Sequence, residues 1–172
     1  MIHTHTMTQL KTVQEPMKWL STNIPTNTTT IPNEAPTATP PSGAGVIPSA
    51  SLNYIKIVPM LNALATTQTI RVTGWSKAIV GTTTYYVPQL LFYGSITALN
   101  TTATALTINS VTLLPVATIT KTQGDAKIYN STSINSTSSI LVDTLGCELV
   151  EVEYFATAGG SATGGNIFYG AI

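Results

Sequence analysis

From residue 52 to its end, the chain consists of short apolar runs rich in Val, Ile, Thr and Tyr, separated by Gly, Asn, Ser and Pro. β-branched and aromatic residues favour strands, and turn residues at this spacing are typical of an all-β sandwich or barrel. We therefore predict an all-β fold, an antiparallel β-sandwich of jelly-roll type. The expected strands are 53–58, 70–78, 84–92, 106–113, 116–121, 126–129, 139–143, 147–155 and 166–171.

Two prolines and two polar segments interrupt this pattern. Pro88 and Pro115 lie inside apolar runs. Because proline cannot donate to a strand ladder, we expect them at a sheet edge, a bulge or a strand end. Residues 62–69 and 95–104 are predicted to be connecting loops, and one helical turn over residues 60–65 is an alternative for the first of them.

Residues 1–50 differ in kind from the rest, because they hold seven of the ten prolines, with Thr and Asn between them. Each proline removes a backbone donor and favours extended geometry in the residue before it. We therefore divide the chain into an extended N-terminal arm, residues 1–50, and a β-sandwich domain, residues 51–172. A short helix around Met17–Leu20 is an alternative at the start of the arm, since apolar residues recur there at helical spacing.

The clearest predicted strand is 147–155. Successive side chains of a strand point to opposite faces, so Val150, Val152 and Tyr154 share one face, which we assign to the core. Leu149 and Phe155 lie on the other face together with two glutamates. This second face suits a subunit contact or a sheet that the arm partly covers.

Polarity without charge is the main feature of the composition. Thr and Ser fill 45 of the 172 positions, whereas charged residues make up only 8%, against about 25% in ordinary soluble domains. The seven basic and seven acidic residues balance, and the basic ones are scattered, which is not the pattern of a nucleic-acid or anionic-lipid surface. Near-zero net charge promotes association, so we expect a homo-oligomer that binds neither nucleic acid nor membrane.

The remaining features concern location and redox state. No run reaches the roughly 18 apolar residues of a membrane helix, and the N-terminus lacks the basic and apolar regions of a secretion signal. We therefore expect a protein that is made and left in the cytoplasm. The single Cys147 excludes an internal disulfide, and we expect it to be a small buried apolar residue inside a strand. Residues 143–146 before it are predicted to form a hairpin turn.

The sequence offers few residues for catalysis. Glu151 and Glu153 lie about 7 Å apart along one strand, but glycosidase carboxylates face each other across a cleft, so we interpret them as a solvated strand face. His3 and His5 are the only histidines and lie in a terminus with no other metal-ligating residue nearby. We expect no enzyme activity, no cofactor and no metal.

Three features together suggest a class of protein: the Thr-, Ser-, Ala- and Asn-rich strands, the extended arm, and the segment 140–152 (ILVDTLGCELVEV) with the later 166–169 (NIFY). In these the chain resembles small structural proteins of tailed bacteriophages, especially capsid decoration or cement proteins. The resemblance implies a jelly roll or similar sandwich, a trimer, and a partner in the major capsid protein. It also implies synthesis in the host cytoplasm and a final place on the outer capsid surface of the virion.

On this resemblance, the leading hypothesis is a decoration protein whose arm clamps neighbouring capsid subunits. The alternative is a carbohydrate- or receptor-binding module of a phage tail or surface fibre, with Trp75, Tyr85, Tyr86 and Tyr93 as a sugar platform, although cross-strand packing is the favoured role of these aromatics. The residues that we expect to bind a partner are Met17, Trp19, Leu20, Ile24, Ile31, Leu149 and Phe155.

Overall fold

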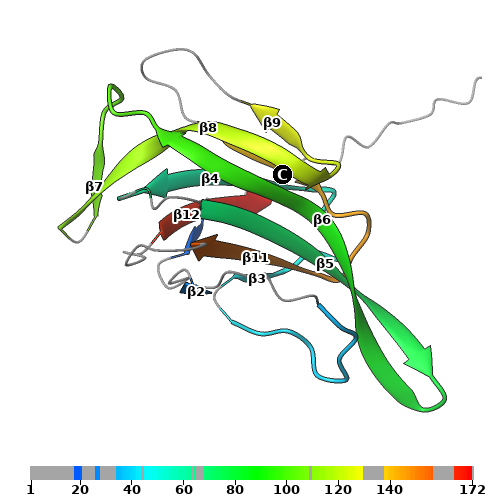
Figure 1. Cartoon of the computed structure of the whole chain (residues 1–172). Coiled ribbons are helices and arrows are strands. Elements are labelled where there is room, and N and C mark those ends of the chain that lie inside the picture. The colour runs from blue at the N-terminus through cyan, green and yellow to red at the C-terminus, as the bar shows by residue number, and fades with distance from the viewer. Residues whose placement is uncertain are drawn as a thin grey trace, which may run out of the picture.

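Twelve β-strands and no helix make up the part of the chain that the computed structural model describes (Figure 1). That part comprises residues 18–20, 26–27, 34–43, 45–62, 64, 68–108, 110–129, 138–156 and 165–171, with side chains described between 34 and 155. The all-β prediction is confirmed. The strands are β1 (Lys18–Leu20), β2 (Thr26–Asn27), β3 (Val46–Pro48), β4 (Tyr54–Leu61), β5 (Gln68–Val80), β6 (Thr83–Leu99), β7 (Leu106–Ile108), β8 (Val111–Gly124), β9 (Lys127–Tyr129), β10 (Ser139–Asp143), β11 (Leu149–Ala156) and β12 (Gly165–Ala171).

Hydrogen-bonded ladders connect the strands in the order β1-β12-β4-β8-β6-β5-β11-β2, with β3, β7, β9 and β10 branching from this path. The pairing of β2 with β11 is parallel, and the other ladders are antiparallel. Strand β8 belongs to three ladders, because Val111–Leu113 pair with β7, Leu114 and Pro115 pair with β4, and residues between Val116 and Gly124 pair with β6. It therefore connects a group around β4, β10 and β12 with a group around β5, β6 and β11.

Both groups of strands contribute to one hydrophobic core. In β4 buried and partly exposed residues alternate, and Ile55, Ile57 and Leu61 are fully buried, as the two-residue period of a strand requires. Burial of each such side chain stabilises the fold by about 1.5–3 kcal/mol. Other residues of the same core cluster are Ile70, Val72, Phe92, Ile96, Val116, Ile119, Ile140, Val142, Val150 and Val152.

Several predicted boundaries are wrong. Gln68 and Thr69, predicted to be loop, begin β5, and the predicted strands 106–113 and 116–121 are instead the short β7 and one continuous strand, β8. Residues 95–99, predicted to be part of a loop, continue β6, because Ile96 lies opposite Ile119 of β8 and is buried in the core. Met60 and Leu61 end β4 and form no helical turn, because Leu61 is fully buried opposite Leu114. At residues 95–99, one inward apolar residue, Ile96, continues the strand within a stretch that contains Gly, Ser and Thr.

The prolines lie where a missing donor is tolerated. Pro88 lies in β6 opposite Trp75, in the part of β6 that no ladder joins on its other side within the described residues. Pro115 lies where β8 changes its ladder partner from β4 to β6, and its carbonyl accepts a hydrogen bond from Asn100 N at 2.7 Å. The expectation of edge or irregular positions is therefore confirmed.

The turn before β11 is present, but it is not a hairpin turn. Cys147 N donates to Thr144 O at 2.9 Å, and both central residues, Leu145 and Gly146, have positive φ. This turn leads from β10, which pairs with β4 and β9, to β11, which pairs with β3 and β5. It therefore crosses between ladders, and Thr144 Oγ1 anchors it by donating to Leu52 O at 2.5 Å.

Strand β3 pairs with the body although it lies inside the predicted arm. Its register pairs Ile47 with Val150 and Val46 with Glu151 of β11. Ile47 is 7% exposed and belongs to the core cluster. The hydroxyl of Ser49, which is fully buried, donates to Cys147 O at 2.7 Å. Contacts of the body with this part of the chain thus begin before residue 51.

Candidate functional site

The outward face of β11 and β5 holds the largest cluster of charged side chains in the described part of the chain. Val150, Val152 and Tyr154 of β11 are 0–3% exposed, so their predicted core position is confirmed. On the opposite face, the register places Glu151 next to Thr73 and Glu153 next to Arg71 of β5. The β5 residues of this face are themselves buried, at 1–5% exposure: Thr69, Arg71, Thr73 and Trp75.

Arg71 is the centre of the cluster. Its Nε donates to Glu153 Oε2 at 2.7 Å, and one of its terminal nitrogens forms an ion pair with Glu34, a residue of the predicted arm. The guanidinium carbon lies 5.0 Å from the centre of the Phe155 ring, within the range of a cation–π contact. One cation thus joins β5, β11 and the chain N-terminal to β3.

Both glutamates of β11 are held in a partly buried environment. Burial raises the pKa of Glu153, against the opposing effect of Arg71. Burial also raises the pKa of Glu151, although a hydrogen bond from Trp75 Nε1 at 3.1 Å favours its charged form. The expectation of a solvated strand face is therefore wrong in part, because both glutamates are only partly exposed and form hydrogen bonds with Trp75 and Arg71.

These carboxylates have structural partners. Glu151 accepts a hydrogen bond from Trp75 and Glu153 accepts one from Arg71. They lie side by side on one strand, which is not the arrangement of two carboxylates that flank a scissile bond. Within the described residues, no group of three His, Cys, Asp or Glu side chains is placed to hold a metal ion.

Residues 34–43, which we call the strap, lie across this face. Beyond Glu34, the strap pairs with β6 through a single bridge: Thr37 N donates to Tyr86 O at 3.0 Å and Tyr86 N donates to Thr37 O at 2.7 Å. Strands β2 and β3, on either side of the strap in sequence, both pair with β11. The described part of the N-terminal region thus folds onto the body of its own chain.

The structure places only some of the predicted partner-binding residues. Trp19 and Leu20 lie in β1, which pairs with β12 with Trp19 opposite Phe168. The alternative of a short helix around Met17–Leu20 is therefore wrong for Lys18–Leu20, the part of it that the structure describes. Met17, Ile24 and Ile31 lie outside the described residues, as do His3 and His5. Leu149 is partly exposed, whereas Phe155 is 5% exposed beneath Arg71.

Trp75 and Cys147 are both buried. Trp75 is 3% exposed, which removes it from the sugar platform considered above and agrees with the favoured packing role. Cys147 is fully buried with a free thiol, as predicted. It lies in the turn before β11 and not inside a strand. Its sulfur fills the space beside Gly74, where an added Cβ would lie 2.5 Å from Sγ.

The β5–β6 hairpin is a second candidate site, and it extends away from the other strands (Figure 1). The β5–β11 ladder ends at Trp75 and the β6–β8 ladder ends at Phe92, whereas β5 and β6 pair with each other out to Val80 and Thr83. At its tip, Ile79 and Val80 are 76% and 65% exposed, more than any other large apolar residue of the described part. The stretch from residue 78 to residue 120 also contains no Asp, Glu, Lys or Arg.

The exposed tip was not among the residues singled out from the sequence, although a signal for it exists. The run Ile79–Thr83 (IVGTT) falls between two predicted strands, and Gly81 there has φ +63°. A glycine in the first position of a two-residue loop is typical of a tight hairpin turn. Apolar residues directly before such a turn are expected to be exposed, because the turn lies at the end of the sheet.

Comparisons with protein-family models, with curated proteins and with solved structures find no match. Within the described residues, no helix has the length and apolar character needed to cross a bilayer.

Proposed function

We propose that this chain is a structural virion protein, a capsid decoration or cement protein that binds the outer capsid surface and stabilises the shell by contacts with neighbouring major capsid subunits. The observation that carries the proposal is the projecting β5–β6 hairpin with Ile79 and Val80 at its tip. Free sheet edges are normally protected by charged residues, especially lysine. A hairpin whose outer part, residues 78–87, carries no charge and whose tip is apolar is better suited to insertion between protein subunits than to exposure in water.

In this proposal the fold is an antiparallel sandwich of jelly-roll type and the protein acts as a homo-oligomer, with a trimer as the favoured state. The N-terminal arm contributes through Trp19, Leu20, Ile24 and Ile31. Leu149 is available as a further contact. Strand addition by extended segments is a common mode of protein recognition, and the pairing of β2 and β3 with the edge of β11 supports the idea that this region forms such contacts readily.

The test uses particles that lack this protein, to which purified protein is added back. The variants are Ile79→Lys with Val80→Lys, and a truncation of residues 1–17, which removes none of the described residues. The control is Lys121→Met, an exposed residue of β8. We expect cosedimentation with particles for the wild type and the control, and a loss of at least about tenfold in affinity for the hairpin variant, because a buried unpaired charge is costly.

Protection of the shell against heat should follow binding in the same samples. If the hairpin variant binds particles as the wild type does, the hairpin tip does not contact the capsid and the proposal loses the observation that carries it. The truncation shows separately whether residues 1–17 contribute to binding. A wild-type protein that fails to bind particles at all would contradict the decoration role itself.

A further inference from the structure

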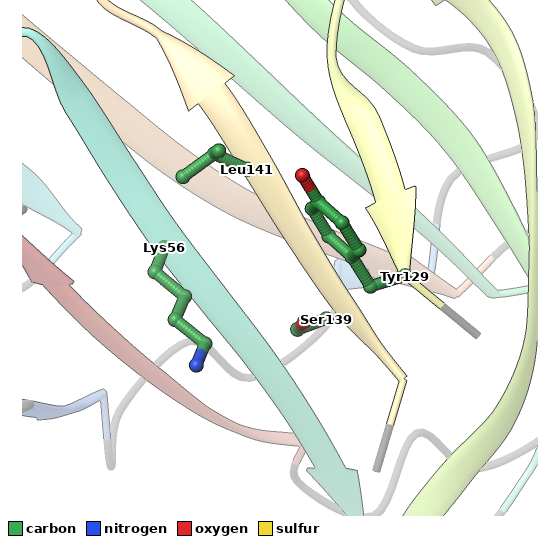
Figure 2. Close-up of a pocket in the computed structure, with 4 residues that line it drawn as sticks. All are labelled: Lys56, Tyr129, Ser139 and Leu141. Atoms are coloured by element: carbon green, nitrogen blue, oxygen red, sulfur yellow. The ribbon is translucent and has the colours of Figure 1, made fainter. Parts of the chain in front are cut away.

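The outward face of β4, β9 and β10 carries a shallow groove with a cavity volume of about 260 Å³. Figure 2 shows its four lining residues, with Lys56 on β4 and Tyr129 on β9 at the two sides and Ser139 and Leu141 of β10 between them. The register explains this arrangement, because Leu141 lies opposite Lys56, and Ser139 lies opposite Tyr129. The neighbours of these β10 residues, Ile140 and Val142, point into the core.

The groove has two lysines beside it, Lys56 of β4 and Lys127 of β9. Lys127 of β9 lies opposite Leu141 from the other side, so two lysines flank one leucine across three adjacent strands. Strands lie about 4.8 Å apart, which puts the two lysine backbones about 10 Å apart and allows both long side chains to reach one ligand. Among the described residues, neither lysine forms an ion pair.

The acidic residues of the described chain lie mostly elsewhere. Glu34 and Glu153 are paired with Arg71, and Glu148 is paired with Lys77. Two aspartates lie near the lysines in sequence: Asp143, next but one to Leu141 in β10, and Asp125, next but one to Lys127. Both line a separate pocket with Leu145, and the Asp143 carboxylate accepts a hydrogen bond from Leu145 N at 2.8 Å. The two lysines are therefore free to attract an anion, which gives the groove its charge preference.

The rest of the lining is suited to a ring with both apolar and hydroxyl groups. Tyr129 is 53% exposed, and an exposed tyrosine offers a flat apolar surface and a polar tip. Leu141 adds an apolar floor beside it, and the Ser139 hydroxyl can both donate and accept. Pockets for drug-sized ligands measure about 300–1,000 Å³, so a groove of about 260 Å³ fits a unit of about one sugar ring.

We propose that this groove binds an acidic saccharide, one ring at a time. The C–H face of the sugar ring packs on Tyr129 and Leu141, the Ser139 hydroxyl meets a sugar hydroxyl, and Lys56 with Lys127 binds the carboxylate or sulfate. An anionic peptide would bind the lysines but would not pack on the ring of Tyr129. Dependence of binding on Tyr129 therefore distinguishes an acidic saccharide from an acidic peptide. The inference is independent of the proposed capsid role, because it concerns a different face from the β5–β6 hairpin.

Calorimetric titration of the full chain tests the proposal with three probes: a galacturonate trisaccharide, a sulfated heparin tetrasaccharide and the neutral galactotriose. We expect both acidic probes to bind and the neutral one to bind at least about tenfold more weakly, since a charged hydrogen bond contributes strongly. The tighter of the two acidic probes identifies the anion. Raising the salt from 0.05 to 0.5 M should weaken both, because exposed charges are screened.

Variants then assign the site. Lys56→Met and Tyr129→Ala each remove an exposed or half-exposed side chain and should leave the unfolding temperature unchanged, while weakening the acidic probes roughly tenfold. Lys121→Met on β8 is the matched control and should bind as the wild type does. Capsid binding by Lys56→Met should also match that of the wild type. Failure of the saccharide proposal can therefore be distinguished from failure of the proposed capsid role.

Three results would overturn the inference. The first is no binding of either acidic probe at millimolar concentration. The second is equal affinity for the neutral probe. The third is binding of a polyglutamate peptide as tight as that of the saccharides, with no effect of Tyr129→Ala, which would make the groove a site for acidic peptides.

Discussion

At the scale of single residues, Arg71 shows how a chain with few charges uses them. Three carboxylates, those of Glu34, Glu151 and Glu153, lie on the face where Arg71 is the buried cation. Removing one partner of a buried ion pair usually costs more than the pair contributes. The surrounding carboxylates therefore stabilise the buried charge of Arg71, in addition to its contact with the Phe155 ring.

Glu151 gives a prediction about pH. Burial raises its pKa above the ordinary value of 4.5, so the folded state disfavours the charged form. The stability that this group contributes is therefore complete below the ordinary pKa and is lost as the pH rises through the raised value. We expect Glu151→Gln to stabilise the protein at pH 7 by less than about 1 kcal/mol, because the half-buried group is partly screened.

Urea unfolding at a series of pH values checks this. The gain of Glu151→Gln over the wild type should shrink toward zero as the pH falls below 4.5. Glu148→Gln is the control, because Glu148 pairs with the exposed Lys77 and surface pairs contribute little. A Glu151→Gln protein that is less stable than the wild type at pH 7 would mean that the hydrogen bond from Trp75 outweighs the burial.

Gly124 gives a prediction about packing. Its φ is +88°, and an added Cβ would lie 2.2 Å from the carbonyl oxygen of Leu91. We expect Gly124→Ala to destabilise the protein by about 3 kcal/mol or more, through the left-handed conformation together with the clash. Gly81→Ala is the matched control, because Gly81 has φ +63° but nothing within 4 Å of the added Cβ; its cost should be about 1 kcal/mol.

Chemical denaturation of both variants separates the cost of the left-handed backbone conformation from the cost of the steric clash. Equal losses for the two would show that the backbone conformation alone decides, and that the ladder near Leu91 yields to a methyl group.

At the scale of elements, the sequence locates most strands but not their lengths or partners. The alternation of Val150, Val152 and Tyr154 predicts the core face of β11 correctly, because a period of two can be read within one strand. The ends of β6 cannot be read in this way, since Gly94, Ser95 and Thr97 look like a loop while Ile96 is buried. The Arg71–Glu34 ion pair joins positions far apart in the sequence, so no local sequence pattern predicts it.

The strap gives a prediction about local stability. It is held to the body by the Glu34–Arg71 pair and the Thr37–Tyr86 bridge, and few contacts of this kind make a segment open before the whole protein unfolds. In Glu34→Gln the guanidinium keeps Glu153, so the unfolding temperature should change little. Amide exchange at Thr37 and Tyr86 should become roughly tenfold faster, as for the loss of one charged hydrogen bond.

Hydrogen exchange followed by mass spectrometry, at the peptides that contain Thr37 and Tyr86, measures this opening. Glu148→Gln again serves as control, because it breaks an ion pair outside the strap and should leave both amides protected. Unchanged exchange in Glu34→Gln would show that the backbone bridge alone keeps the strap in place.

At the scale of the whole molecule, a net charge of zero hides an uneven distribution. The face of β5 and β11 carries Glu34, Glu148, Glu151 and Glu153 against Arg71 and Lys77, four acidic residues against two basic ones. The face of β4, β9 and β10 carries Lys56 and Lys127, with Asp143 farther along β10 and Asp125 shortly before β9. The uncharged stretch 78–120 includes β6 and the first part of β8, which lie between β5 and β4 in the strand order.

The position of the boundary between the N-terminal arm and the folded body determines which N-terminal truncations leave the body folded. Composition places the limit at residue 50, since seven of the ten prolines lie before it, but composition cannot show which arm residues enter the core. The structure has Ile47 in the core and β3 on the edge of β11. A truncation that removes β3 therefore perturbs the body, and a loss of capsid binding by such a protein would say nothing about the arm.

Two truncations and one substitution test this argument together. Removal of residues 1–17 leaves every described contact in place, so we expect an unfolding temperature within a few degrees of that of the full chain. Ile47→Ala should cost about 2–4 kcal/mol, as for other large-to-small changes in a core. Removal of residues 1–48 combines that loss with those of the β3 ladder and the Glu34–Arg71 pair, which approaches the whole stability of about 5–15 kcal/mol of a typical domain. We therefore expect this shorter protein to be largely unfolded by circular dichroism; if it unfolds at the same temperature as the full chain, β3 is not part of the folded body.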